Sequence, residues 1–270
     1  MNAAPGSRKR CPPGQRGRRE NLPLDDGDDK RESRRGWLWP GETSRLSLFV
    51  TGTDTGVGKT HTVIQLLRLL CASRARCAGM KPICCGDRRD AELLLAAGSG
   101  GLTIDEINPV WLKTPVAPLA AAHIEHVKID IEHIMAALRT LQDRVEHVVV
   151  EGVGGWLVPI GADYFVSDLA VEMKLPVLVV AQNRLGCLNH TALTIRSIAD
   201  HGLFCAGVVL NELPGATSVA SATNADILRE IIDVPLLSRL TENMDQLPLG
   251  WWETMGLSGT PRMSSTQTQV

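Results

Sequence analysis

A glycine-rich segment directly after an apolar run constrains this chain more than any other feature. Residues 46–50 (LSLFV) have the apolar character of a strand, and they lead into residues 52–60 (GTDTGVGKT). Glycine lets the backbone close around phosphate oxygens without a Cβ clash, and the N-terminus of a following helix presents free N–H groups. The segment therefore predicts a strand, a phosphate-binding loop and a helix in that order.

Two side chains at the end of this loop have the chemistry that phosphate binding needs. Lys59 is long enough to reach the outer phosphates, and Thr60 places a hydroxyl where it can bind a magnesium ion. Five residues separate Gly52 from Gly58, one more than in the usual phosphate loop. The alternative is a Gly/Thr-rich turn that binds nothing, but the strand before it and the helix after it favour phosphate binding.

The composition fits one α/β domain with tails. The chain has 270 residues, 44% of them hydrophobic, and a net charge of −2. No apolar run approaches the ~20 residues that span a bilayer, and near-neutral charge gives no electrostatic case for nucleic acid. We therefore expect no membrane and no nucleic-acid partner. The seven cysteines lack the paired spacing of a zinc site, so we expect reduced thiols and a cytoplasmic location.

The chain divides into three parts. Residues 1–45 are rich in Arg, Asp, Gly and Pro with almost no apolar periodicity, which predicts a disordered N-terminal extension. Residues 46–240 alternate short Val/Ile/Leu-rich runs with longer helical patterns, which is typical of parallel βαβ units. Residues 241–270 are interpreted as a C-terminal tail.

The fold class expected for the central part is α/β, with a doubly wound, mainly parallel sheet and helices on both faces. The strand runs are almost continuously apolar, as expected for strands that are covered on both sides. The expected strands are 46–51, 77–81, 146–151, 176–181, 205–210 and 235–238.

Charged side chains follow two of these strands at the edge where such sheets bind ligands. Glu151 follows one strand and is a candidate magnesium partner, Lys81 follows another, and Asp90 lies at the expected start of a helix. Taken singly, Asp90 is explained as a first-turn acid and Lys81 as a solvated strand end. Their convergence beside a phosphate loop favours a functional site.

Several motifs together resemble the dethiobiotin synthetase family over about residues 47–240. The motifs are residues 50–55 (VTGTDT), 80–82 (MKP), 108–109 (NP), 115–118 (PVAP), 150–156 (VEGVGGW), 185–191 (LGCLNHT) and 209–211 (VLN). The last three motifs together are much more specific than a phosphate loop alone. The resemblance implies a P-loop NTPase-like fold.

The resemblance also implies an ATP-dependent cyclo-ligase. Its substrates would be 7,8-diaminopelargonic acid, CO2 and ATP, and its products dethiobiotin, ADP and phosphate. One amine becomes a carbamate, the carbamate takes the γ-phosphate to give a carbamic–phosphoric anhydride, and the second amine displaces phosphate. Every step creates or moves negative charge, so positioning and electrostatic stabilisation are the main demands on the protein.

Residue roles follow from the matched motifs. Lys59 and Lys81 would be catalytic, and magnesium would be held by Thr60, Asp90 and Glu151. ATP would be bound by Thr55, Gly56, Val57, Gly58, Lys59, Thr60 and Asn211, the last through the base. Substrate would meet Thr55, Lys81, Cys85, Gly186 and Asn189, with the segment from Gly186 to Asn189 reaching across a homodimer interface.

Two departures from the family pattern affect the expected site. Cys85 stands where a serine is common, and a thiol is a weaker hydrogen-bond donor. Gly56 stands where a glutamate is common in some members. Two other functions share the sheet and the loop: a nucleotide-dependent switch or partition-type ATPase, and a catalytically silent regulatory relative. The second loop lysine of the switch group is absent, since Thr53 and Asp54 occupy that region.

Overall fold

The computed structural model describes residues 47–72, 74–212 and 218–240. The extension expected at residues 1–45 and the tail expected at residues 241–270 lie outside the described residues. The strands are β1 Ser47–Gly52, β2 Cys77–Met80, β3 Ile83–Cys85, β4 Val110–Leu112, β5 His147–Gly155, β6 Pro159–Gly161, β7 Tyr164–Phe165, β8 Val177–Gln182, β9 Cys205–Asn211 and β10 Leu236–Leu240. The helices are α2 Lys59–Ala72, α3 Arg89–Ala97, α4 Ile104–Ile107, α5 Pro118–Ile124, α6 Ile131–Arg144, α7 Val166–Met173, α8 Cys187–Asp200 and α9 Val219–Ile231.

Six strands form one sheet in the order β10-β9-β8-β1-β5-β2, and every neighbouring pair is parallel. All six strands expected from the sequence are in this sheet, so the expected α/β class is confirmed. The largest difference in bounds is at β5, which continues to Gly155 and not only to residue 151. Small pairs β3-β4 and β6-β7 were not expected, because two- or three-residue strands leave no periodic pattern.

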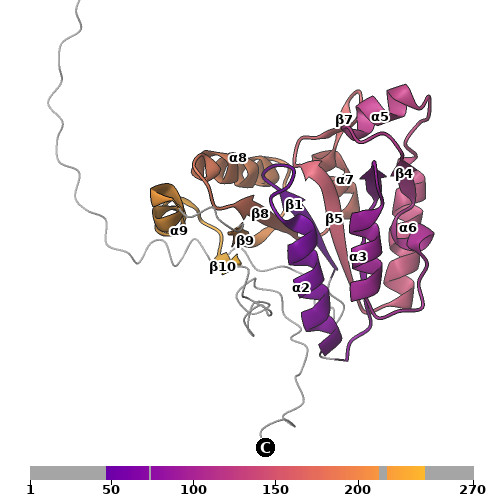
Figure 1. The fold of residues 1–270 in the computed structure, drawn as a ribbon, viewed down its shortest axis with the longest axis horizontal. Coiled ribbons are helices and arrows are strands. Elements are labelled where there is room, and N and C mark those ends of the chain that lie inside the picture. The colour runs from indigo at the N-terminus through magenta and orange to yellow at the C-terminus, as the bar shows by residue number, and fades with distance from the viewer. Residues whose placement is uncertain (1–46, 73, 213–217, 241–270) are drawn as a thin grey trace, which may run out of the picture. The chain divides into compact units, whose positions relative to one another are not determined.

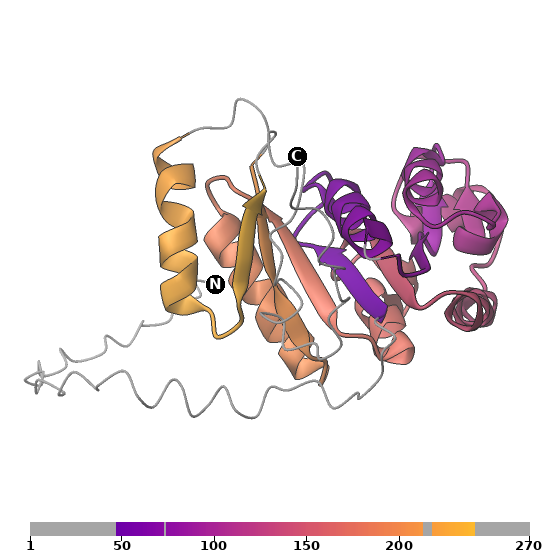
Figure 2. The same cartoon turned by 90° about the horizontal axis from the view of Figure 1, so that it is seen from below.

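Helices cover both faces of the sheet, as the doubly wound prediction requires. Figures 1 and 2 show α2 on one face and α7 and α8 on the other. The first crossover leads from β1 through α2 to β2, and the later strands β8, β9 and β10 lie on the other side of β1. The chain thus reverses its direction across the sheet at β1. In such sheets this is the point where ligands bind.

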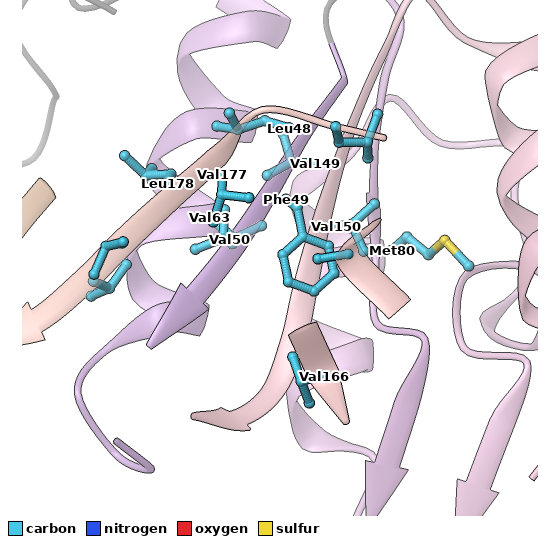
Figure 3. Close-up of a cluster of buried hydrophobic side chains, with 14 of the residues drawn as sticks. Leu48, Phe49, Val50, Val63, Met80, Val149, Val150, Val166, Val177 and Leu178 are labelled. Atoms are coloured by element: carbon cyan, nitrogen blue, oxygen red, sulfur yellow. The ribbon is translucent and has the colours of Figure 1, made fainter. Parts of the chain in front are cut away.

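The core lies between the sheet and its helices. Phe49 is completely buried among the apolar side chains of β1, β5 and β8 (Figure 3). Helix α2 buries Val63, Leu66, Leu67 and Leu70, which share one face because their spacing follows the 3.6-residue helical period. This apolar packing fixes the loop that joins β1 to α2 at both of its ends.

One cysteine expectation was wrong. The structure pairs Cys71, near the end of α2, with Cys77, at the start of β2, as a disulfide. The tight connection between helix and strand turns the chain back on itself and leaves these two Cα atoms 6.4 Å apart. A six-residue separation matches no recognised motif, so nothing in the sequence indicated this disulfide. Free thiols in the described part of the chain are Cys84, Cys85, Cys187 and Cys205.

Among the described residues, no helix combines the length and the apolar character that crossing a membrane would require.

Phe49→Ala tests how strongly this core supports the fold. The substitution removes a fully buried ring and leaves a cavity, so the free energy of unfolding should fall by about 3–5 kcal/mol. Denaturant titration followed by circular dichroism measures this. Ile231→Ala is the matched control, because Ile231 is about half exposed and its loss should change the stability by no more than about 0.5 kcal/mol. Equal effects of the two variants would contradict the assigned core.

Candidate active site

The loop between β1 and α2 has the backbone form that phosphate binding requires. An added Cβ at Gly52 would lie 2.7 Å from the carbonyl oxygen of Asp54 and 2.9 Å from Nζ of Lys59. Gly58 has a φ of +94°, and a Cβ there would overlap the side-chain amide of Asn211. Both positions therefore need glycine. Helix α2 begins immediately afterwards, at Lys59.

Lys59 is buried inside this loop. Its Nζ donates a hydrogen bond to the carbonyl oxygen of Asp54 at 3.2 Å. Burial, together with the nearby charge of Lys81, lowers the pKa of Lys59 to about 8. Among the described residues, the hydrogen-bond acceptor of this ammonium group is that backbone carbonyl, and an anion beside it would raise the pKa of Lys59 again.

A cluster of charged side chains lies beside the loop. Lys81 Nζ is 2.6 Å from Oε1 of Glu151 and 2.9 Å from Oδ2 of Asp90. Thr60 donates its hydroxyl to the same Oε1 of Glu151 at 2.8 Å. The four residues come from α2, the end of β2, the first turn of α3 and β5. The convergence expected from the sequence is thus present in the structure.

Lys81 and Asp90 hold each other ionised. Burial opposes the charge on Lys81, but the carboxylates of Glu151 and Asp90 outweigh it and raise the pKa of Lys81 well above its usual value. In the same way, burial would raise the pKa of Asp90, but Lys81 outweighs it and the pKa is lowered. Lys81 is therefore protonated at neutral pH.

The oxygen atoms of this cluster fit a magnesium ion. Oε2 of Glu151 is buried and has no hydrogen-bond partner, which leaves one carboxylate oxygen available to a cation. Magnesium is commonly held by one or two carboxylates together with substrate phosphates and water. In the described part of the chain no three His, Cys, Asp or Glu side chains are grouped as a metal site. Thr60, Asp90 and Glu151 could hold a magnesium ion through their oxygen atoms.

These residues face a cleft of about 650 Å³. Thr55, Gly56, Gly58, Lys59, Thr60, Lys81, Cys85, Asp90 and Glu151 all line it, as the sequence analysis expected of site residues. Cys85 is partly buried, and burial raises the pKa of its thiol to about 11. It is therefore neutral at physiological pH and offers at most a weak hydrogen bond. The cleft can hold a phosphate chain at one end and a small anionic substrate beside Lys81.

Four expected residues, Val57, Gly186, Asn189 and Asn211, do not line this cleft in the single chain. Gly186 and Asn189, at the start of α8, are exposed on another part of the surface. Asn211 is buried behind the loop, and its Nδ2 donates to the carbonyl oxygen of Val57 at 2.9 Å. Val57 is itself buried.

Further cleft residues were not identified as site residues from the sequence. Cys84 belongs to the short strand β3, and Val158 follows β5. Neither position lies in a pattern that indicates binding. Pro115, Val116, Ala117 and Pro118 also line the cleft, and only their place in a family motif drew attention to them.

The fold and the loop define a P-loop nucleotide-binding protein of the α/β class. A family model described as an AAA domain matches residues 47–247. Among solved structures, the signal recognition particle receptor FtsY from Elizabethkingia anophelis, in complex with GDP, is similar at 14% identity and a TM-score of 0.50. The match covers 81% of this chain and 65% of that one, and it shows likeness of fold alone.

Curated relatives identify the family within this class. The ATP-dependent dethiobiotin synthetase BioD of Akkermansia muciniphila is 43% identical over 203 residues, which are 75% of this chain and 95% of the relative. The protein of the same name from Aromatoleum aromaticum is 43% identical over 72% of this chain and 90% of its own length, and that from Bacillus licheniformis is 37% identical over 74% and 87%. The chain belongs to the dethiobiotin synthetase family.

The lowered pKa of Lys59 predicts a pH-dependent affinity for ATP. Below pH 8 the free protein already carries the Lys59 proton, so binding of phosphate needs no proton uptake. Above pH 8 the free lysine is neutral, and phosphate binding, which favours the charged form, takes up a proton. Affinity for ATP should therefore fall by up to about tenfold per pH unit above pH 8.

Calorimetry at pH 7.5 and 9, in two buffers of different ionisation enthalpy, measures this proton uptake directly. Lys59→Arg is the matched control, because a guanidinium stays protonated throughout this range. Proton uptake that persists unchanged in Lys59→Arg would show that another group is responsible.

Proposed function

We propose that this chain carboxylates 7,8-diaminopelargonic acid with CO2 and closes the ring with ATP, giving dethiobiotin, ADP and phosphate. The observation that carries the proposal is the arrangement of Lys59, Lys81, Asp90 and Glu151 in one cleft beside the phosphate loop. A fixed cation next to a phosphate site is what a carbamate and its phosphorylated derivative need. Membership of the dethiobiotin synthetase family supports the same reaction.

In this proposal, ATP lies with its phosphates in the β1-α2 loop. Backbone N–H groups of residues 55–60 and the N-terminus of α2 donate to the phosphate oxygens. Lys59 binds the outer phosphates and stabilises the charge on the group in transfer. Asn211 is proposed to read the base, which requires its Nδ2 to exchange the Val57 carbonyl for a base edge.

Lys81 is proposed to hold the carbamate. Its raised pKa keeps the proton on Nζ, so it supplies a positive charge to the carbamate oxygens without donating a proton to the nucleophile. Thr55 and Cys85 line the same cleft and supply neutral contacts to the substrate. The two catalytic roles are thus divided between a lysine for phosphate and a lysine for carbamate.

Magnesium is the proposed cofactor, held by Thr60, Asp90 and Glu151. When bound, it neutralises phosphate charge during the transfer. The protein's own contribution is to fix the three oxygen groups on three different elements, α2, α3 and β5. Because Lys81 contacts both carboxylates, these side chains hold the lysine in place as well.

A homodimer is proposed to complete the substrate site. Gly186 and Asn189 are exposed and do not line the cleft of their own chain, which fits residues that serve a neighbouring subunit. Leu185 beside them is 84% exposed, as expected for a side chain that a partner covers. We propose a cytoplasmic location, where ATP is available as co-substrate.

Phosphate release by the purified protein tests the function. With magnesium-ATP and bicarbonate, phosphate should appear only when 7,8-diaminopelargonic acid is added, and mass spectrometry should find an equal amount of dethiobiotin. Lys81→Met should lower kcat/KM for the diamine by about 100-fold or more, because it removes the cation proposed to hold the carbamate. Thermal unfolding checks that the fold survives loss of the positive charge beside the buried Glu151. Diamine-independent hydrolysis would instead favour a switch ATPase, and ATP binding without turnover would favour a silent relative.

The proposed domain boundaries make a separate prediction. Because residues 1–40 have no apolar periodicity, their removal should leave kcat/KM and the midpoint of thermal unfolding within error of the full chain. Activity assays and thermal unfolding of the truncated chain measure both quantities. Loss of folding would mean that these residues contribute to the core.

A further inference from the structure

Arg88 is a largely buried cation that the proposed reaction does not use. It directly precedes α3, and its side chain is only 14% exposed. It makes no side-chain cap for α3. Its guanidinium is instead directed to the segment that contains α4 and β4, which lies about 20 residues further along the chain. A buried arginine outside the phosphate loop needs an explanation.

The guanidinium clamps this segment through several different contacts. Nε donates to Oδ1 of Asn108 at 2.9 Å, and Nη2 donates to the carbonyl oxygen of Asn108 at 3.1 Å. The guanidinium carbon also lies 5.0 Å from the centre of the Trp111 ring. Trp111 in turn donates its indole N–H to the carbonyl oxygen of Gly86 at 2.8 Å. Gly86 and Arg88, in the turn before α3, are therefore both bonded to the segment of residues 108–111.

Asn108 passes this constraint on to Lys81. Its Nδ2 donates to the carbonyl oxygen of Lys81 at 2.8 Å, and Asn108 is almost completely buried. The backbone N–H of Lys81 donates to the carbonyl oxygen of Ile107 at 2.8 Å. Both backbone polar groups of Lys81 are thus held by the two residues at the end of α4. Arg88 fixes the asparagine that makes one of these bonds.

Arg88 also fixes the position of Asp90. Asp90 is in the first turn of α3, two residues after Arg88, so an anchored Arg88 sets where this turn begins. Lys81 and Asp90 meet at 2.9 Å between Nζ and Oδ2. Arg88 therefore fixes both the backbone of Lys81, through Asn108, and the turn of α3 that carries Asp90.

We propose that Arg88 is a positioning residue that sets Lys81 against Asp90, and so aligns the carbamate site with the magnesium carboxylate. This rests on the proposed function for the roles of those two residues. Arg88 itself does not line the cleft. The phosphate loop lies between other elements, β1 and α2.

Two substitutions at Arg88 separate positioning from charge. Arg88→Met keeps the length of the side chain and removes its donors, whereas Arg88→Lys keeps the charge and loses the planar fork that bonds Asn108 twice. Both should lower kcat/KM for the diamine by about 10- to 100-fold, because small misplacements of reacting groups have effects of this size. KM for ATP should rise less than KM for the diamine, because the β1-α2 loop holds the phosphates and only one proposed magnesium ligand, Asp90, is displaced.

A binding measurement without turnover supports the same comparison. The Kd of 7,8-diaminopelargonic acid, measured by calorimetry in the absence of metal and ATP, should rise about tenfold in both variants. Asn108→Asp keeps an acceptor for Arg88 but loses the donor to the Lys81 carbonyl, so it should reproduce the defect. Combined with Arg88→Met it should add little, because the two residues act in one chain of contacts.

Asp105→Asn is the matched control. Oδ1 of Asp105 forms an ion pair with Nη1 of Arg88 at 2.9 Å, but the Asp105 side chain is 83% exposed. An exposed pair contributes little, so this variant should behave like the unmodified protein. Thermal unfolding of every variant checks that the fold is retained.

The outcomes distinguish the two proposals. If the unmodified chain forms no dethiobiotin, the proposed function has failed. If it does and Arg88→Met matches it, or Arg88→Lys restores activity, or affinities for ATP and diamine fall equally, then the positioning role is overturned. Should Arg88→Met fail to fold, Arg88→Lys and Asn108→Asp decide the question by the same criteria.

Discussion

The ion cluster of Lys81 with Glu151 and Asp90 is the interaction on which the rest of the site depends. Lys81 and Glu151 are both almost completely buried, so each would be strongly disfavoured as a charge by itself. Their contact at 2.6 Å, and that of Lys81 with Asp90, compensates for the lost hydration. Removing one partner would leave an uncompensated buried charge, so loss of any one of the three side chains would disrupt the site.

The parallel sheet explains why these charges meet. The carboxyl ends of β1, β2 and β5 lie at one edge, and the register that pairs Val50 with Glu151 places the carboxylate beside the start of the phosphate loop. The strands themselves are apolar and buried on both faces, so they provide a rigid frame for the polar residues at their ends. The residues at the end of α4 then hold the backbone of Lys81 within this frame. Its N–H donates to the carbonyl oxygen of Ile107, and its carbonyl oxygen accepts from the side-chain amide of Asn108.

The sequence predicted the parts of the site that follow long, regular elements. Lys59 and Glu151 could be located because each adjoins an apolar strand or the phosphate loop, and the end of a parallel strand is where side chains converge. The Arg88 clamp could not be predicted, because bonds between a side chain and a distant carbonyl leave no periodic pattern. The pairing of Cys71 with Cys77 was hidden for a similar reason, since it depends on the geometry of one tight turn.

The pKa values of the two lysines in the cleft are shifted in opposite directions. This difference determines beside which lysine an incoming anion is more stable. Lys81 is neutralised by carboxylates of its own chain, so its pKa is raised and its charge is constant. In the described part of the chain Lys59 forms no ion pair with a carboxylate, and its lowered pKa of about 8 shows that burial outweighs the carboxylates nearby. An anion that enters from outside therefore gains more beside Lys59 than beside Lys81, which favours phosphate in the loop.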